Sequence, residues 1–154
     1  MPSVSRFRVF ATVFLAALLL LSLLHCGDST PRASMPQSLD GGWTRTSVEP
    51  IDVAAAPESL KRLGVTSGQS STYEREGRKV PVRVYELPSG TAAFEAQQTF
   101  TRSADEYYFT MGASFVVVEA STLANEERRP FLMAFVEAAR PANASQEQEP
   151  QEQK

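Results

Sequence analysis

An apolar run near the N-terminus constrains this chain more than any other feature of its sequence. Two basic residues, Arg6 and Arg8, precede an uncharged run from Val9 to Leu24, which His25 and Cys26 close. A basic start followed by an apolar block is the layout of a secretory signal or of a single membrane anchor. We therefore expect the body of the protein to lie outside the cytoplasm.

The length of this run bears on whether it stays in the membrane. As a helix, Val9 to Leu24 would span about 24 Å at about 1.5 Å per residue, whereas the hydrocarbon core of a bilayer is roughly 30 Å thick. The run is short for a permanent span and favours a signal sequence, although extension to Gly27 keeps an uncleaved anchor open. Both alternatives export the body.

The residues around Cys26, the single cysteine of the chain, resemble a known processing site. The segment from Leu23 to Gly27 (LLHCG) resembles the lipobox of bacterial lipoproteins, in which a leucine stands three residues before the acylated cysteine. The resemblance implies that Cys26 is lipidated, but it departs from the lipobox at His25, where the family has a small residue. Two alternatives stay open: Cys26 ends an uncleaved helix, or cleavage follows the small residues Gly27 and Ser29.

Composition divides the chain into four segments. Residues 1–26 are the signal peptide or membrane anchor. Residues 27–39 are rich in Ser, Pro, Gly and Thr and predict a flexible linker. Residues 141–154 consist largely of Gln, Glu, Ala and Pro and predict a disordered acidic tail. The remainder, residues 40–140, is long enough for one modest core and too short for two domains.

Charge and rare residues argue against several functional classes. The chain has 15 basic and 18 acidic residues, and Arg6 and Arg8 fall in the predicted signal, so the exported part is acidic. Nucleic-acid binding calls for a basic footprint, so we expect no such partner. His25 is the only histidine, so the exported part lacks the usual base of a serine or cysteine hydrolase and a common metal ligand. We expect no metal, no cofactor and no catalytic constellation.

Hydrophobic periodicity predicts an α+β domain. We expect a mostly antiparallel sheet of four to five strands in β-α-ββ-α-ββ-α order, with helices on one face. The predicted strands are residues 43–48, 71–76, 79–87, 106–111 and 114–120. The predicted helices are residues 57–63, a helix capped by Ser89 or Thr91 that includes Phe100, and a helix that begins near Pro130.

The last predicted strand and the last predicted helix should form most of the core. The run from Val116 to Val118 is apolar on both faces and predicts the central strand of the sheet. The helix after Pro130 carries Phe131 and Phe135 on a broad apolar face suited to lying across the sheet. This order of elements over residues 40–140 resembles small exported bacterial proteins of unknown function, a likeness of layout that implies no active-site residues.

Two groups of residues form a candidate interaction surface. The first hairpin carries a basic group that could contact a phosphate-bearing glycan or lipid headgroup, or could instead protect an edge strand. Three aromatic residues could line a ligand or partner surface, or could instead seal the core. The basic residues are Arg75, Arg78, Lys79 and Arg83, and the aromatic residues are Trp43, Tyr107 and Tyr108.

Four carboxylates define an alternative. Two paired carboxylates are enough for glycoside hydrolysis. Glu74, Glu76, Glu86 and Glu119 are the candidates, although alternating strand positions of this kind usually form a solvated face.

These observations predict a membrane-tethered, extracytoplasmic domain of a bacterial envelope protein, at the periplasm or cell surface, with a binding or accessory role and no enzymatic activity. The expected partners are the membrane, through the N-terminal segment, and an envelope protein or glycan. The alternatives are a carboxylate-dependent enzyme acting on envelope carbohydrate and a structural subunit of an envelope complex.

We predict that a reporter fused after Lys154 is active only if it functions outside the cytoplasm, because the apolar run exports the residues on its C-terminal side. Activity of a strictly cytosolic reporter would contradict export. The variant Cys26→Ala separates the forms of attachment. If Cys26 is lipidated, membrane attachment and mature mass both change, and if the helix is uncleaved, neither does.

Overall fold

The computed structural model describes residues 32–140 of the chain. The predicted signal or anchor with Cys26, the first residues of the predicted linker and the predicted acidic tail lie outside the described residues. Within residues 32–140, none of the helices has the length and apolar character needed to cross a bilayer.

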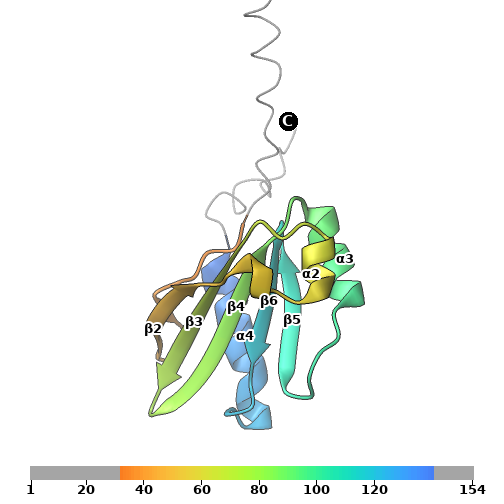
Figure 1. The fold of residues 1–154 in the computed structure, drawn as a ribbon. Helices are drawn as coiled ribbons and strands as arrows, with labels where there is room; N and C mark the ends of the chain where they lie inside the picture. Colours follow the sequence, from red (N-terminus) through yellow and green to blue (C-terminus); the bar gives the residue numbers. More distant parts are fainter. Residues whose placement is uncertain (1–31, 141–154) are drawn as a thin grey trace, which may run out of the picture.

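The fold is α+β, as predicted, and is built on a curled antiparallel sheet of six strands in the order β1-β2-β3-β4-β6-β5 (Figure 1). The strands are β1 (Ser38–Leu39), β2 (Trp43–Pro50), β3 (Ser67–Arg75), β4 (Arg78–Glu86), β5 (Glu106–Met111) and β6 (Ser114–Glu119). The helices are α2 (Glu58–Arg62), α3 (Gly90–Thr99) and α4 (Asn125–Ala139), with a short 3-10 helix η2 (Val53–Ala55).

Both predicted hairpins are present. β3 and β4 are joined by Glu76 and Gly77, whose φ values of 53° and 77° are the left-handed pair that a tight two-residue hairpin turn needs. β5 and β6 pair in register around the turn at Gly112. The predicted cap of α3 is also confirmed, because the Ser89 hydroxyl accepts a hydrogen bond from the Ala92 N–H at 3.2 Å.

The sheet has one strand more than predicted, and the element order differs accordingly. The additional strand is β1, which pairs with the start of β2. It lies in residues 32–39, which composition predicted to be linker. Instead the Ala33 N–H donates to Ser114 Oγ at 2.7 Å and the Tyr73 hydroxyl donates to the Pro36 carbonyl at 2.8 Å, while Leu39 is buried. A segment without apolar periodicity can dock in this way because single side chains and backbone groups suffice to hold it.

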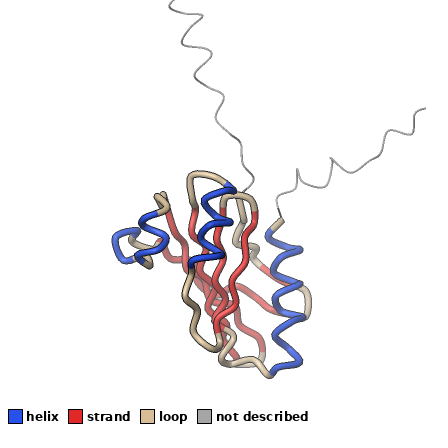
Figure 2. Tube along the Cα trace, turned by 90° about the vertical axis from the view of Figure 1, so that its right-hand side faces the viewer, coloured by secondary structure: helices blue, strands red, loops and turns tan. Residues whose placement is uncertain are grey.

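The helices cover both faces of the sheet, so the prediction of helices on one face is wrong (Figure 2). On one face Phe131 and Phe135 of α4 form a buried cluster with β4 residues that include Val82. On the other face Leu60 of α2 and alanines of α3 form a second cluster with Tyr85. The physical reason is that β4 and β6 carry apolar side chains on both faces, and each face needs its own cover.

We predicted that β6 is the central strand of the sheet. It is an interior strand, but it is not the central one. The order of strands places β3 and β4 in the middle and β6 next to the β5 edge. Val116, Val117 and Val118 are nevertheless almost fully buried. Their burial comes from helices above and below the strand. An apolar run on both faces therefore does not indicate that a strand lies at the centre of its sheet.

α4 begins at Asn125 rather than near Pro130, which lies inside the helix. Pro130 removes only one backbone donor, whereas Glu126 and Glu127 stand in the first turn, where the helix dipole favours negative charge. The Glu127 carboxylate also accepts a hydrogen bond from the Ala124 N–H at 3.4 Å. These acidic residues extend the helix backwards past the proline.

Aromatic contacts fasten α4 to the sheet. The rings of Trp43 and Phe131 lie 5.1 Å apart between centroids at 85°, and those of Tyr73 and Phe135 lie 5.8 Å apart at 90°. Such edge-to-face pairs add stabilisation beyond the area that they bury. The same burial raises the pKa of Tyr73 well above its ordinary value.

We predict that Phe135→Ala lowers the free energy of unfolding by about 3–5 kcal/mol, because the Phe135 side chain is fully buried between α4 and the sheet. Met133→Ala is the matched control, since Met133 lies on the same helix with 61% of its surface exposed. Chemical denaturation of the chain from Gly27 onward, followed by circular dichroism, measures both. Equal stability of the two variants would show that a different face of the helix is buried.

Candidate functional site

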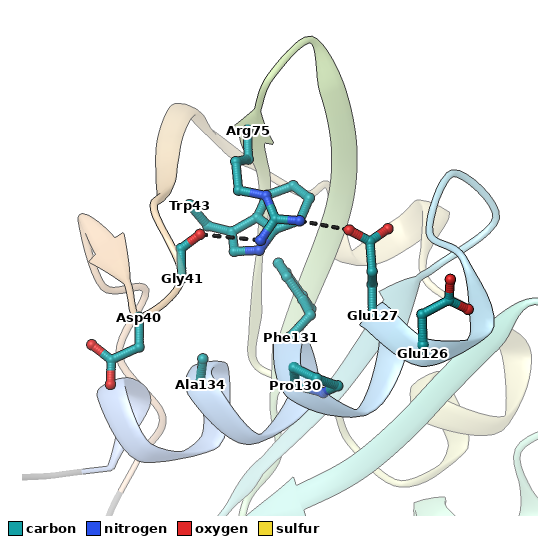
Figure 3. Close-up of a pocket in the computed structure, with 9 residues that line it drawn as sticks. All are labelled: Asp40, Gly41, Trp43, Arg75, Glu126, Glu127, Pro130, Phe131 and Ala134. Atoms are coloured by element: carbon teal, nitrogen blue, oxygen red, sulfur yellow. Dashed lines mark hydrogen bonds and ion pairs between the residues drawn. The ribbon is translucent and has the colours of Figure 1, made fainter.

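A pocket forms where residues 126–134 of α4 meet the β1–β2 turn and the end of β3 (Figure 3). We call it the distal pocket, because it lies away from the end of the domain where the Ser34 N–H donates to the Ala139 carbonyl at 3.2 Å. Its volume is about 360 Å³. It is lined by Asp40, Gly41, Trp43, Arg75, Glu126, Glu127, Pro130, Phe131 and Ala134.

Arg75 is the central side chain of this pocket. Its guanidinium lies over the Trp43 ring, with Cζ 4.7 Å from the ring centroid, as Figure 3 shows. One nitrogen donates to the Gly41 carbonyl at 3.1 Å and another contacts the Glu127 carboxylate at 2.6 Å. Arg75 therefore ties together the β1–β2 turn, β3 and α4.

The β3–β4 hairpin explains why Glu127 is needed. Arg75 and Arg78 lie directly opposite each other across the two strands, and like charges in that position repel. The Glu127 carboxylate accepts hydrogen bonds from both, one on each oxygen. The hydrogen bond from Arg78 is the main reason that the pKa of Glu127 falls below its ordinary value.

Two further carboxylates of the pocket have no ion-pair partner among the described residues. Asp40 lies on the β1–β2 turn and Glu126 in the first turn of α4, and both are exposed. Figure 3 shows them at opposite ends of the pocket, with Pro130 and Ala134 between them. The pocket is therefore an apolar floor with an available negative charge at each end.

The structure does not bring all the predicted surface residues together. Trp43, Arg75 and Arg78 gather around Glu127. Lys79 is exposed on β4 opposite Glu74. Three other residues lie elsewhere: Arg83 on the face of the sheet that α2 and α3 partly cover, Tyr107 beside Arg128 of α4, and Tyr108 against Phe100 and Phe115.

The alternative that the basic residues protect an edge strand stays a prediction. β3 lies between β2 and β4, but β4 pairs with β6 only from Val82 to Glu86, so Arg78 and Lys79 have no described strand on that side. Ion pairs with α4 or within the sheet hold Arg75, Arg78 and Arg83. A hairpin inferred from sequence gives no information about which strands pair on its outer sides, so this outcome required the tertiary structure.

The four candidate carboxylates are dispersed. Glu74 and Glu76 lie near the β3–β4 turn. Glu86 lies at the far end of β4, where it accepts a hydrogen bond from the Ser114 hydroxyl at 2.8 Å. Glu119 lies beside Arg83, whose Nη2 atom is 2.6 Å from its carboxylate.

Glu119 has a carboxylate neighbour that sequence reasoning missed. Glu106 is directly opposite Glu119 across β5 and β6, and its carboxylate is 2.8 Å from the same Arg83 nitrogen. The sequence could have predicted this pair, because matching the residues of the two strands outward from the turn at Gly112 places Glu106 opposite Glu119. A hydrogen bond from the Ser103 backbone is the main reason that the pKa of Glu106 is lowered.

Asp40, Glu126 and Glu127 were also missed. Glu126 and Glu127 carried a usable signal, because paired acids before a helical apolar face mark a first turn. No local sequence signal marked Asp40, because its position next to α4 depends on the docking of residues 32–39.

Comparison with known proteins gives no relative for this chain: no family model, no curated protein and no solved structure matches it. Within residues 32–140, no group of three or more His, Cys, Asp or Glu side chains is placed to hold a metal ion. The function must therefore be inferred from the chemistry of the described residues and from the N-terminal sequence.

We predict that Glu127→Gln lowers the melting temperature at neutral pH and reduces its dependence on pH. The pKa of Glu127 is lower in the folded protein than in the unfolded chain, so its contribution is complete above the unfolded value of about 4.3 and is lost as the pH falls through the folded value. The wild-type melting temperature should accordingly fall below about pH 4 more steeply than that of the variant.

Glu126→Gln is the matched control, because Glu126 is the adjacent residue and forms no ion pair with the described residues. Its pH profile should follow that of the wild type. Thermal melts between neutral and acidic pH measure all three proteins. Parallel profiles for Glu127→Gln and the wild type would show that the bridge to the two arginines does not stabilise α4.

Proposed function

We propose that this protein is a membrane-tethered, extracytoplasmic binding module of a bacterial envelope, and that the distal pocket is its binding site. The basic start, the apolar run from Val9 to Leu24 and the lipobox-like segment around Cys26 support the tether and its location. The pocket supports a binding role because it combines an apolar floor with carboxylates that no described residue neutralises.

The position of the pocket suits a tethered protein. The N-terminal segment joins the domain beside the last residue of α4, where Ser34 contacts Ala139. The pocket is built on residues 126–134 of the same helix, which has 15 residues and is therefore about 22 Å long. An anchor at the N-terminus would therefore join the domain at the opposite end of α4 from Glu126 and Glu127.

The lining indicates the chemistry of the ligand. Arg75 is already paired with Glu127 and stacked on Trp43, so the pocket offers little positive charge to an anionic ligand. Asp40 and Glu126 offer negative charge on either side of an apolar floor. We infer that the ligand is a short protein segment with basic side chains on both sides of an apolar one.

A second candidate function has one specific observation in its favour. The carboxylates of Glu106 and Glu119 lie 2.8 and 2.6 Å from one nitrogen of Arg83, so they are close together, as the two carboxylates of a retaining glycosidase are. The lowered pKa of Glu106 suits an ionised role and not that of a general acid, which needs a raised pKa. The first proposal is therefore preferred.

We predict that the test peptide Lys-Leu-Lys, with blocked termini, binds the distal pocket and that Glu-Leu-Glu does not. Trp43 is the single tryptophan of the chain and lines the pocket, so its fluorescence reports occupancy. Asp40→Asn and Glu126→Gln should each weaken binding by about tenfold, the effect of one charged contact. Glu137→Gln, on an exposed part of α4, should leave it unchanged.

Equal binding of both peptides, or unchanged affinity in Asp40→Asn and Glu126→Gln, would contradict the cationic ligand. A response to a neutral envelope oligosaccharide in place of the basic peptide would favour a glycan partner. Hydrolysis of that oligosaccharide, lost in Glu106→Gln and in Glu119→Gln, would favour the enzyme.

A further inference from the structure

Residues 32–39, which we call the strap, join the N-terminal segment of the chain to the distal pocket. The strap ends at Leu39, and the next two residues, Asp40 and Gly41, line the pocket. The Gly41 carbonyl accepts a hydrogen bond from Arg75 at 3.1 Å, as Figure 3 shows. The positions of two lining residues therefore depend on where the strap lies.

Hydrogen bonds and a single buried side chain hold the strap on the domain. The Ala33 N–H donates to Ser114 Oγ at 2.7 Å, and the Tyr73 hydroxyl donates to the Pro36 carbonyl at 2.8 Å. Further hydrogen bonds join Ser34 to Ala139, and Met35 and Gln37 to Arg45. Leu39 is the one residue of the strap that is buried.

The packing around the first residues of the strap is loose. A hollow of about 240 Å³ is lined by Arg32 and Ala33 of the strap, by residues 67–69 of β3 and by Glu86. One oxygen of the Glu86 carboxylate is buried without a hydrogen bond to the described residues and lies 3.5 Å from Arg32 Nε. A segment with few buried apolar contacts opens at a lower free energy than the core.

We propose that the strap undocks as a unit before the domain unfolds, and that its docking controls whether the distal pocket can bind its ligand. The docked strap places the Asp40 carboxylate at one end of the pocket and the Gly41 carbonyl against Arg75. When the strap undocks, both groups leave. Only the docked fraction of the molecules then has a complete pocket, and the apparent affinity falls with that fraction.

This regulation rests on the proposed function of the distal pocket, and it acts in both directions. A ligand that binds only the docked state lowers the undocked fraction, because the coupling between two equilibria is reciprocal. A displacement of the chain before Arg32 acts on the strap first and so weakens ligand binding. The strap thereby links the N-terminal attachment of the domain to its binding site.

Hydrogen–deuterium exchange of the full chain in detergent, read by mass spectrometry, tests the proposal. In the wild type, residues 33–39 should exchange faster than β4 and β6. The peptide Lys-Leu-Lys, at ten times its dissociation constant, should slow the exchange of residues 33–39 about tenfold. The fluorescence of Trp43 shows in the same samples whether the peptide is bound.

Leu39→Ala removes the apolar anchor of the strap without changing a residue that lines the pocket. It should speed the exchange of residues 33–39 at least tenfold and weaken peptide binding about tenfold. Leu60→Ala is the matched control, because it removes a buried leucine from the cluster on the opposite face of the sheet. It lowers the stability of the whole domain and should change neither strap exchange nor peptide affinity.

Tyr73→Phe guards against a folding defect in Leu39→Ala, because it keeps the buried ring and removes only the hydroxyl that donates to Pro36. It should speed the exchange of residues 33–39 about fivefold, the effect of one lost hydrogen bond. Tyr108→Phe, in the cluster on the opposite face, should not.

Exchange of residues 33–39 as slow as that of β4 and β6 would show that the strap does not undock separately and would overturn the proposal. Equal strap exchange in Leu39→Ala and Leu60→Ala would overturn it as well. A peptide that changes Trp43 fluorescence without slowing strap exchange overturns the regulation and leaves the proposed function standing. If the peptide gives no Trp43 response, the proposed function fails and this regulation fails with it.

Discussion

The pairing of β4 with β6 is the interaction on which the rest of the structure depends. Both strands carry apolar side chains on both faces, so neither face of their ladder can be left in water. One face requires α4, and the other requires α2 and α3. The layers of the domain follow from this single constraint, and the strands farther out, β2 and β5, need less cover because their outward side chains are more polar or only half-buried.

The cover supplied by α4 also creates the distal pocket. Phe131 and Phe135 fix the position of the helix over the sheet, and Glu127 then falls between Arg75 and Arg78. The ion pairs orient the first turn of the helix against the hairpin, while the aromatic contacts supply most of the stabilisation. The helix that closes the core therefore also lines the pocket, through Glu126 and Pro130.

The N-terminal attachment, the distal pocket and the β5 edge occupy separate parts of the domain. Ser34 contacts the C-terminal end of α4, the pocket lies along residues 126–134 of that helix, and β5 lies beside α3. The bulge, the charge and the proline on β2 protect that strand from pairing with another strand.

The sequence by itself determined the local elements. Alternation in Val80, Val82 and Val84, the turn glycines and the Ser89 cap specify strands, hairpins and a helix start through contacts between near neighbours. It also determined that an apolar run precedes the domain. Only the tertiary structure decided that helices cover both faces, that residues 32–39 add a strand, and that Asp40 lines the same pocket as Glu126. Each of these depends on residues far apart in the chain, whose proximity is set by the burial of a whole face and leaves no periodic signal in the local sequence.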